Sequence, residues 1–318
     1  MQKANLIGRS ALYSLTFLMI SIPLSLFTTC LWLLFPLTDW DWFLKLHRIF
    51  LACTLVSVCA LFIVLFIFHR LFVPERNFLF DPLNNAKVHV GLTAYNDEIC
   101  IGDAVREFKN CSYVDRVIVV DNNSQDNTYK EALKSGADRV VVEHTPGYGS
   151  CCMRTLAEAA IGLDDNDAIV LCEGDMTFSA EDVKKFLAYL ENCDLVLGTR
   201  ATQELRATKT QMDWLINPAN QIVAKMIQTR FWGTRLTDVG CTYRAMRVRT
   251  YHTLKNRLWV RGNHFSPHMF MEALKLRMRV LEIPVVFKVR AGESKGVGSN
   301  KLKASRVAIR MLGLLYTS

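Results

Sequence analysis

Two acidic side chains at the end of one apolar run are the residues in this chain best suited to metal chemistry. The stretch 168–178, AIVLCEGDMTF, is apolar until it reaches Glu173, Gly174 and Asp175. Two carboxylates one residue apart after a buried strand are costly unless a cation neutralises them. Mg²⁺ and Mn²⁺ prefer oxygen ligands, usually one or two carboxylates plus the phosphates of a substrate. Gly174 would let the backbone approach a ligand closely. The spacing predicts a Mg²⁺ or Mn²⁺ site at Glu173 and Asp175, and the competing interpretation is a strand followed by an acidic turn.

Two further apolar runs also end in polar residues. The run at 88–92 leads into TAYNDE, and the run at 117–120 leads into DNNSQDNT. Asp121 is the type of carboxylate that accepts hydrogen bonds from ribose hydroxyls or a base, and Tyr95 could stack on that base. Each segment alone could be a turn with a helix cap. Because ligands bind at the carboxyl ends of the strands in a parallel sheet, the three segments together predict one crevice.

The elements that must position these residues follow an alternating pattern. Short apolar runs alternate with helical patterns near 100–108, 126–135, 150–161 and 180–190; the runs are 88–92, 117–120, 139–142, 168–171 and 194–198. Strands at this spacing imply βαβ units, so we predict an α/β fold with a mainly parallel sheet covered on both faces. The glycines of PGYGSCCMRT, at 146–155, either pack against a nucleotide or form a simple loop.

The N-terminal part of the chain has the composition of a membrane anchor. Hydrophobic residues make up 51% of the 318 residues, and no charged residue occurs in 11–37 or in 49–68. Each run is long enough to cross a bilayer, so we predict a hairpin of two transmembrane helices, about 11–37 and 49–72. A cleaved signal peptide is the alternative for the first run. The predicted organisation is an anchor at 1–77, a linker at 78–87, an α/β body at 88–300 and a basic amphipathic helix at 301–318.

Charge favours a body on the cytoplasmic side of a membrane. Four basic residues flank the hairpin on the side of the body, and two lie in its loop, which is a slight positive-inside bias. The formal charge of +8 suits anionic lipid headgroups and phosphate-bearing substrates. Basic residues are dispersed and accompany no DNA- or RNA-binding motif, so nucleic acid is not an expected partner. The ten cysteines show neither the spacing of a zinc site nor an obvious disulfide framework.

Seven segments in a fixed order resemble the family-two glycosyltransferases, which have the GT-A fold. They are TAYNDE, VVDNNSQDNT, GYGSCCMRTLAEA, EGDMTFSAED, LVLGTRA, TDVGCTYRAMR and VRAGESKG. Within this family the chain is most similar to the polyprenyl-phosphate glycosyltransferases, which are dolichol-phosphate mannose synthase-like. The resemblance covers residues 88 to about 300 and implies a Rossmann-like GT-A domain there, with the hairpin outside it.

The resemblance implies roles for particular side chains. The nucleoside of the sugar donor is held at positions that match Thr93, Tyr95, Asp97 and Asp121, with Thr177 at a further polar position of the donor site. Glu173 and Asp175 match the metal-binding D-x-D. The basic positions that meet the donor diphosphate or the acceptor phosphate are matched by Arg200, Arg290, Ser294 and Lys295. The D-x-x-S-G-F-R element of the family aligns with Asp238, Cys241 and Arg244.

The chain departs from the family pattern at four of these positions. Asn122 replaces the second aspartate of the DDGS motif and Asn123 replaces its glycine. Glu173 replaces the first metal carboxylate, and Cys241 replaces the serine of D-x-x-S. Glutamate can still bind a metal. Cys241, by contrast, lacks the serine hydroxyl with which family members contact the acceptor phosphate.

The residues and the resemblance predict a membrane-bound, inverting, metal-assisted glycosyltransferase that moves a sugar from a nucleotide-sugar donor to a polyprenyl (undecaprenyl or dolichyl) phosphate. A lipid phosphate is already anionic, so positioning by arginines matters more than a strong base. Asp238 is therefore expected to orient other groups, and the alternative is a buried partner of Arg244 or Arg247. A processive polysaccharide synthase and an inactive scaffold of the same fold are competing functions. UDP-glucose, UDP-N-acetylhexosamine and GDP-mannose remain open as donors, and so does assembly into a homo-oligomer.

Two other segments have a helical pattern with an apolar side. The segment 213–233 either lies in the membrane interface, where it would admit a lipid acceptor, or packs on the sheet. The tail 301–316 mixes basic and apolar residues, so it either attaches to acidic lipid or forms a terminal helix with a solvated charged face.

Overall fold

The computed structural model describes residues 2–34, 41–68, 78–208, 210, 216–231, 234–291 and 301–317. These residues belong to two compact units, one comprising Met1–Arg76 with Met226–Gly233 and the other comprising Asn77–Lys225 with Thr234–Ser318. The predicted ends of the transmembrane helices at 37 and 72, and the start of the segment 213–233, lie outside the described residues.

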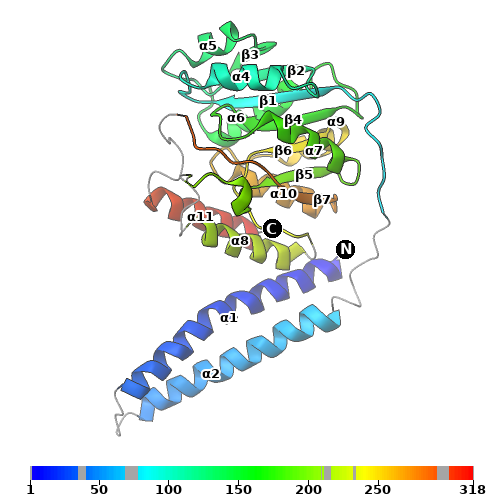
Figure 1. Ribbon diagram of the computed structural model, residues 1–318. Coiled ribbons are helices and arrows are strands. Elements are labelled where there is room, and N and C mark those ends of the chain that lie inside the picture. Colours follow the sequence, from blue (N-terminus) through cyan, green and yellow to red (C-terminus); the bar gives the residue numbers. More distant parts are fainter. Residues whose placement is uncertain are drawn as a thin grey trace. The chain divides into compact units, whose positions relative to one another are not determined.

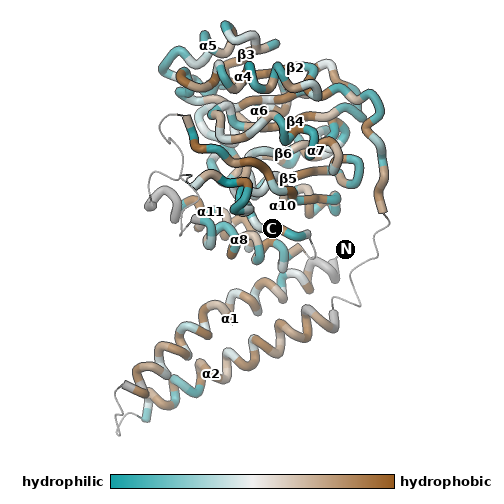
Figure 2. Tube along the Cα trace, viewed as in Figure 1, coloured by the Kyte–Doolittle hydropathy of each residue, from teal (hydrophilic) through white to brown (hydrophobic). Residues whose placement is uncertain are grey.

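The first unit contains two long apolar helices that run side by side. They are α1 (Gln2–Leu34) and α2 (Asp41–Phe62), and α2 continues into the π-helical turn η1 (Ile63–Phe68) (Figure 1). The segments Leu6–Leu31 and Asp41–Phe62 are long and apolar enough to cross a membrane, and both helices are hydrophobic over most of their length (Figure 2). α2 begins before the charge-free run at 49, because charged side chains such as Asp41 end the apolar stretch without ending the helix.

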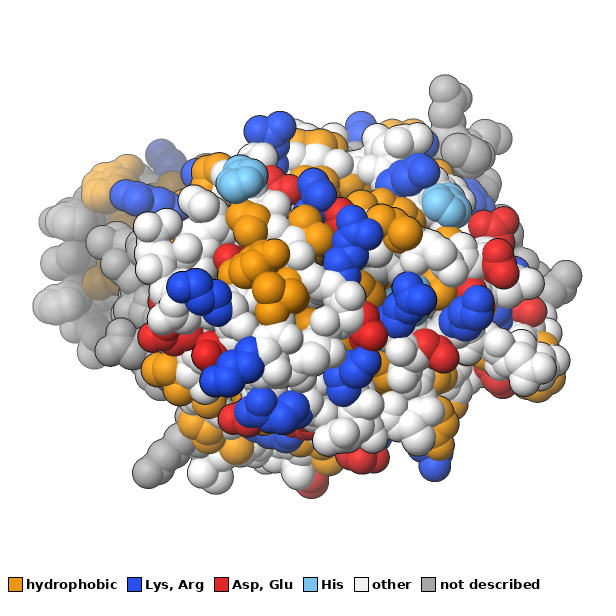
Figure 3. Space-filling model, turned by 90° about the horizontal axis from the view of Figure 1, so that it is seen from above, with side chains coloured by type: hydrophobic (Ala, Val, Ile, Leu, Met, Phe, Trp, Pro, Cys, Tyr) orange, Lys and Arg blue, Asp and Glu red, His pale blue; other side chains and the backbone are white. Residues whose placement is uncertain are grey.

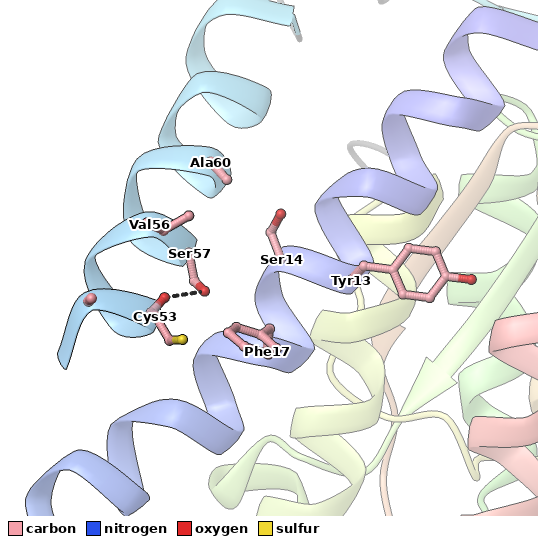
Figure 4. A pocket seen from close by; sticks show the side chains of 8 residues that line it. Tyr13, Ser14, Phe17, Cys53, Val56, Ser57 and Ala60 are labelled. Atoms are coloured by element: carbon pink, nitrogen blue, oxygen red, sulfur yellow. Dashed lines mark hydrogen bonds between the residues drawn. The ribbon is translucent and has the colours of Figure 1, made fainter. Parts of the chain in front are cut away.

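A groove of about 550 Å³ lies between α1 and α2. It is lined by Tyr13, Ser14, Phe17, Ala52, Cys53, Val56, Ser57 and Ala60. Phe17 and Cys53 face each other across it, whereas the ring of Tyr13 points away from α2 (Figure 4). Ser57 donates a hydrogen bond to the carbonyl of Cys53 at 2.7 Å, and Thr28 Oγ1 lies 3.0 Å from His47 Nδ1. These polar side chains find partners within the hairpin.

The second unit is built on a seven-stranded sheet in the order β3-β2-β1-β4-β6-β5-β7. Its strands are β1 (Val88–Ala94), β2 (Arg116–Asp121), β3 (Arg139–Val142), β4 (Ala168–Glu173), β5 (Leu195–Thr199), β6 (Arg244–Arg247) and β7 (Val280–Pro284). β6 lies antiparallel between β4 and β5, and the other neighbours pair in parallel. The mainly parallel sheet is as predicted, and the sequence reading missed β6 and β7.

Helices cover both faces of this sheet. On one face, apolar side chains of α4 (Ile101–Lys109) and α7 (Val183–Leu190) form one core with Val88, Val90 and Leu92 of β1. On the opposite face α6 (Tyr148–Ala159) packs against Gly91, where a Cβ would lie 2.4 Å from Thr155 Cγ2. Glycine at this position therefore lets α6 approach the sheet closely.

Five further helices and three short 3₁₀ turns occur among the described residues. They are α5 (Thr128–Lys134), α8 (Ile216–Phe231), α9 (Val248–Leu254), α10 (Phe265–Lys275) and α11 (Lys301–Thr317), with the short 3₁₀ turns η2 (Ala180–Asp182), η3 (Gln203–Leu205) and η4 (Lys255–Arg257). On α11, Val307, Met311 and Leu315 are buried at a spacing of one helical turn, while Arg306 and Arg310 are exposed. On the face of the molecule seen in Figure 3, basic and acidic side chains are intermixed.

Candidate active site

The register of the sheet brings the polar ends of three strands to the same edge. Thr93 of β1 pairs with Glu173 of β4, and Ala94 of β1 pairs with Asp121 of β2. Because these strands are parallel, the residues that follow them all leave the sheet at this edge. The three polar segments predicted to form one crevice therefore follow β2, β1 and β4 at the same edge of the sheet.

Arg290 links two of these strand ends through ion pairs. Its Nη2 lies 3.0 Å from Asp97 Oδ1 and its Nη1 lies 3.4 Å from Asp175 Oδ2. Asp175 is buried and also accepts hydrogen bonds from the N–H of Thr177 at 3.1 Å and from its hydroxyl at 2.5 Å. The acidic partners raise the pKa of Arg290 although burial acts in the opposite direction. Arg290 is thus held as a cation among carboxylates contributed by different strands.

Glu173 is fixed by a hydrogen bond from a distant part of the chain. Thr242 donates to Glu173 Oε1 at 2.7 Å, and Tyr148 donates in turn to Thr242 Oγ1 at 2.5 Å. Burial, together with the neighbouring charge of Asp175, raises the pKa of Glu173 to about 7. Two acids in this environment favour a cation beside them.

Gly174 serves the fold in this structure and does not make room for a ligand. A Cβ at Gly174 would lie 2.4 Å from Ile101 Cδ1 and 3.3 Å from the carbonyl oxygen of Thr93. Its N–H donates to that same oxygen at 2.9 Å. The close approach that requires glycine is therefore between the β4 end, β1 and α4, which corrects the expectation from the sequence.

The donor set at this strand end fits a hard divalent cation that takes further ligands from its substrate. Glu173 and Asp175 supply carboxylate oxygens, which Mg²⁺ and Mn²⁺ prefer. Within the described part of the chain, His, Cys, Asp and Glu side chains form no group of three or more that could hold a metal. Phosphate and water oxygens would have to complete the coordination.

Asp121 lies at the end of β2 in a buried position. Ser124 donates to its Oδ1 through the main-chain N–H at 3.2 Å and through the hydroxyl. Burial raises the pKa of Asp121, and the nearby charges of Asp126 and Asp97 act in the same direction. Tyr95, by contrast, is 47% exposed.

The two asparagines that follow Asp121 have structural explanations. Asn122 donates through its side-chain amide to the carbonyls of Glu143 and Thr145 at 3.0 and 2.9 Å, and accepts from the N–H of Gly147 at 3.2 Å. An aspartate could not donate to these carbonyls. Asn123 has φ +58°, a left-handed conformation that asparagine tolerates better than most residues. Both departures from the family motif therefore preserve the local backbone.

Asp238 is a fully buried acceptor that holds Arg200. Its Oδ2 accepts from the main-chain N–H and Nε of Arg200 at 3.1 and 2.7 Å, and its Oδ1 accepts from Arg200 Nη2 at 2.9 Å. Asn220 Nδ2 at 3.1 Å and the N–H of Gly240 at 2.9 Å also donate to Oδ1. Although burial alone would raise it, the pKa of Asp238 is lowered by Arg200 and these donors. The partner of Asp238 is thus Arg200, and not Arg244 or Arg247.

Arg244 is buried, and its guanidinium contacts the main chain. Its guanidinium donates to the carbonyls of Cys241, Thr242 and Ser266, and burial lowers its pKa. This arginine therefore braces the main chain that positions Thr242. The predicted residues Ser294 and Lys295 lie outside the described residues.

The glycines of the GYG segment serve packing against main chain. A Cβ on Gly147 would lie 2.4 Å from the carbonyl oxygen of Arg261, and a Cβ on Gly149 would lie 2.1 Å from that of Val260. The N–H groups of Gly149 and Ser150, at the start of α6, donate to the carbonyl of Arg261 at 2.8 and 3.3 Å. Gly147 thus precedes α6 and Gly149 lies in its first turn, where both pack against the main chain of 260–261.

Tyr148 and Thr242 are site residues that the sequence reading missed. A weak signal existed at Thr242, which occupies the glycine position of D-x-x-S-G-F-R, while Glu173 occupies the first aspartate position of D-x-D. The sequence contains no such signal for Tyr148, because a tyrosine between two glycines is also typical of a loop.

Comparison with known proteins relates this arrangement to sugar transfer. Residues 90–254, more than half of the chain, match the family described as Glycosyl transferase family 2. The chain is 26% identical over 207 residues to a dolichyl-phosphate hexose transferase of Haloferax volcanii, an alignment that covers 65% of this chain and 85% of the relative. It is 27% identical over 192 residues to an undecaprenyl-phosphate mannosyltransferase of Micrococcus luteus, covering 57% and 76%.

The fold has relatives among solved structures as well. The crystal structure of glucosyl-3-phosphoglycerate synthase from Mycobacterium tuberculosis, in complex with Mn²⁺, UDP-glucose and phosphoglyceric acid, matches with a TM-score of 0.55 and 18% identity. The match covers 73% of this chain and 80% of that one. The sheet topology and this match confirm the predicted GT-A fold, and the extent of the family match shows that the chain belongs to glycosyl transferase family 2.

Proposed function

We propose that this chain is a membrane-bound inverting glycosyltransferase that moves a sugar from a nucleotide-sugar donor to a polyprenyl phosphate, assisted by Mg²⁺ or Mn²⁺. The main supporting observation is that Arg290 pairs with Asp97 and Asp175 at the edge of the sheet where Asp121 ends β2. The relatives named for dolichyl-phosphate and undecaprenyl-phosphate support the acceptor class. The solved relative in complex with Mn²⁺ and UDP-glucose supports the metal and the donor class.

Glu173 and Asp175 would hold the metal. When bound there, the cation would stabilise the negative charge that develops on the diphosphate leaving group. Arg290, 3.4 Å from Asp175, is close enough to meet the same diphosphate. Asp121 would accept from the nucleoside, with the exposed ring of Tyr95 beside it.

Other predicted donor-site residues would act by holding these groups in place. Asp97 accepts from the N–H of Tyr95 at 3.0 Å while it pairs with Arg290. Thr177 donates its hydroxyl to Asp175, and Thr93 Oγ1 lies 3.5 Å from the carbonyl oxygen of Cys172. Their contribution is orientation of charged groups before the substrate arrives.

Asp238 would orient Arg200 and would not remove a proton. Five donors contact its carboxylate, and the side chain has no exposed surface. A phosphate nucleophile is already anionic and needs no strong base. Direct in-line attack by that phosphate on the anomeric carbon inverts the configuration there, and arginines such as Arg200 would set its position.

The helices α1 and α2 would anchor the protein as a two-pass hairpin, with the α/β body in the cytoplasm, either at a bacterial inner membrane or at an endomembrane. Their length and apolar character support this placement. The test of orientation is a reporter fused to the carboxyl terminus of the full chain. Activity of a reporter that functions only outside the cytoplasm would contradict the proposal.

The function is tested with full-length protein in detergent, radiolabelled UDP-glucose, UDP-N-acetylglucosamine and GDP-mannose, and undecaprenyl or dolichyl phosphate. We expect a short lipid-linked sugar that forms only with a divalent metal, and we expect Asp175→Asn to abolish its formation. The matched control is Asp167→Asn, a buried aspartate before the amino end of the same strand that accepts from the N–H of Lys87 at 2.8 Å. A long polymer would indicate a processive synthase, and no transfer together with no metal-dependent nucleotide binding would indicate a scaffold.

A further inference from the structure

A chain of two hydrogen bonds leads from α6 to the predicted metal site. Tyr148 Oη lies 2.5 Å from Thr242 Oγ1, and Thr242 Oγ1 lies 2.7 Å from Glu173 Oε1. The three residues come from the start of α6, from the segment before β6 and from the end of β4. Thr242 is only 3% exposed, so the contact with Glu173 lies within the protein.

The chemistry of the three side chains determines which group donates and which accepts in each of these two hydrogen bonds. With a cation beside it the Glu173 carboxylate is ionised and only accepts hydrogen bonds, so the single proton of the Thr242 hydroxyl points to Glu173. The oxygen of Thr242 is then free to accept from Tyr148. Burial keeps the pKa of Tyr148 well above its usual value, and the phenol therefore retains the proton that it donates. Hydrogen bonds arranged in one direction strengthen one another.

Rigid main chain holds both donors in place. Tyr148 lies between Gly147 and Gly149, which pack against the carbonyls of Arg261 and Val260. Arg244 fixes the other donor by hydrogen bonds to the carbonyls of Cys241 and Thr242. The GYG segment thus fixes the hydroxyl group of Tyr148, and Arg244 fixes that of Thr242.

Glu173 and Thr242 depart from the family motifs together. Glutamate has one more rotatable bond than the aspartate of D-x-D, so more conformational freedom is lost when its carboxylate is fixed. Threonine at the glycine position of D-x-x-S-G-F-R supplies the hydroxyl that fixes it. With Oε1 bound to Thr242, Oε2 is the oxygen left for a cation.

We propose that Tyr148 and Thr242 are positioning residues that orient the Glu173 carboxylate toward the divalent metal, and that Thr242 compensates for the glutamate in the D-x-D position. This inference rests on the proposed function, because it requires a metal at Glu173 and Asp175. Outer hydrogen-bond partners of this kind typically change metal affinity about 10–100-fold when they are removed.

The experiment measures metal binding without any turnover. Full-length protein in detergent, with UDP or GDP and no sugar donor or acceptor, is titrated with Mn²⁺, and free Mn²⁺ is followed by electron paramagnetic resonance. Thr242→Val keeps the shape and removes the donor, so we expect about tenfold weaker Mn²⁺ binding. Thr242→Ser restores the hydroxyl and is expected to restore the affinity. Thermal unfolding of each variant establishes that the protein is folded.

Two further variants separate positioning from general packing. Tyr148→Phe is expected to weaken Mn²⁺ binding less than Thr242→Val, and adding it to Thr242→Val should cause no further loss, because Tyr148 acts through Thr242. Tyr243→Phe is the matched control, since it also removes a buried tyrosine hydroxyl, one that donates to the carbonyl of Ser179 at 2.9 Å. It is expected to leave Mn²⁺ binding unchanged.

The outcomes distinguish this inference from the proposed function. Wild-type protein that binds Mn²⁺ with nucleotide, together with a Thr242→Val variant of equal affinity, would overturn the positioning role and leave the function standing. Failure of Thr242→Ser to recover affinity, or an equal loss in Tyr243→Phe, would assign the effect to packing and also overturn it. Wild-type protein with no Mn²⁺-dependent nucleotide binding would overturn both.

Discussion

Replacing Asp238 with alanine tests the assignment of this residue as the partner of Arg200. The side chain of Asp238 has no exposed surface and that of Arg200 is 17% exposed. Removing one member of a buried ion pair leaves the other charge without compensation and typically costs about 3–5 kcal/mol. We therefore expect Asp238→Ala to lower the free energy of unfolding by about this amount.

Asparagine at the same position is expected to be nearly as harmful. The two carboxylate oxygens accept three and two hydrogen bonds, respectively. Whichever way an asparagine side chain is turned, its NH₂ group faces at least two donors that then have no acceptor. A double variant, Arg200→Met with Asp238→Leu, removes both charges and is expected to be more stable than either aspartate variant.

The assay is thermal unfolding of full-length protein in detergent, followed by circular dichroism. For a unit of this size about 1 kcal/mol corresponds to about 2–4 °C in Tm, so Asp238→Ala should lower Tm by roughly 6–20 °C. A Tm equal to that of the wild type would refute the buried-pair reasoning. If Asp238→Asn were also stable but inactive in transfer, Asp238 would have to act chemically, as a base.

Three other perturbations test the rest of the site. Because burial raises the pKa of Asp121, its carboxylate is protonated at a higher pH than an ordinary aspartate, and we expect UDP affinity to fall as pH falls through that pKa. Asp121→Asn should lack this dependence, and an unchanged pH profile in the variant would count against the role. Gly149→Ala would place Cβ 2.1 Å from the Val260 carbonyl oxygen and should destabilise the protein by at least about 1–3 kcal/mol, which an unaltered Tm would contradict. Arg290→Gln should weaken UDP binding about tenfold or more, since hydrogen bonds to charged groups contribute about 1.5–3 kcal/mol. Lys288→Gln, which removes the ion pair with Glu107, is its control, and equal losses in both variants would refute a specific role for Arg290.

The first five strands could be predicted because each contains a short apolar run bounded by helical patterns. β1, β2 and β4 are buried on both faces and rich in Val, Ile and Leu, so the runs stand out in the sequence. β6 has the sequence RAMR, in which two of four residues are arginines, and it was missed. Both arginines can be buried because main-chain carbonyls accept hydrogen bonds from their guanidinium groups. Such compensation depends on tertiary contacts that no local pattern shows.

The acidic residues of the site were predictable for a related reason, and their partners were not. A carboxylate directly after a buried run is visible as a break in the apolar pattern, as at Asp121 and Glu173. The hydrogen bond from Thr242 to Glu173 spans 69 residues, and the ion pair of Arg290 with Asp97 spans 193. Which donor reaches which acid depends on how β6 inserts between β4 and β5. Asp238 illustrates this, since its partner proved to be Arg200, next to β5.

The charge balance of the site explains why a cation suits it. Arg200 is matched by Asp238, and among the described groups Arg290 pairs with Asp97 and Asp175, next to Glu173. Asp121 adds a further carboxylate at the end of β2. The excess negative charge contributes to the raised pKa of both Glu173 and Asp121, together with burial. A divalent cation would compensate that excess and favour the ionised carboxylates that bind it. The diphosphate of a sugar donor brings further negative charge to the same place. The metal and Arg290 would then both contribute to holding the diphosphate, and loss of either should weaken donor binding.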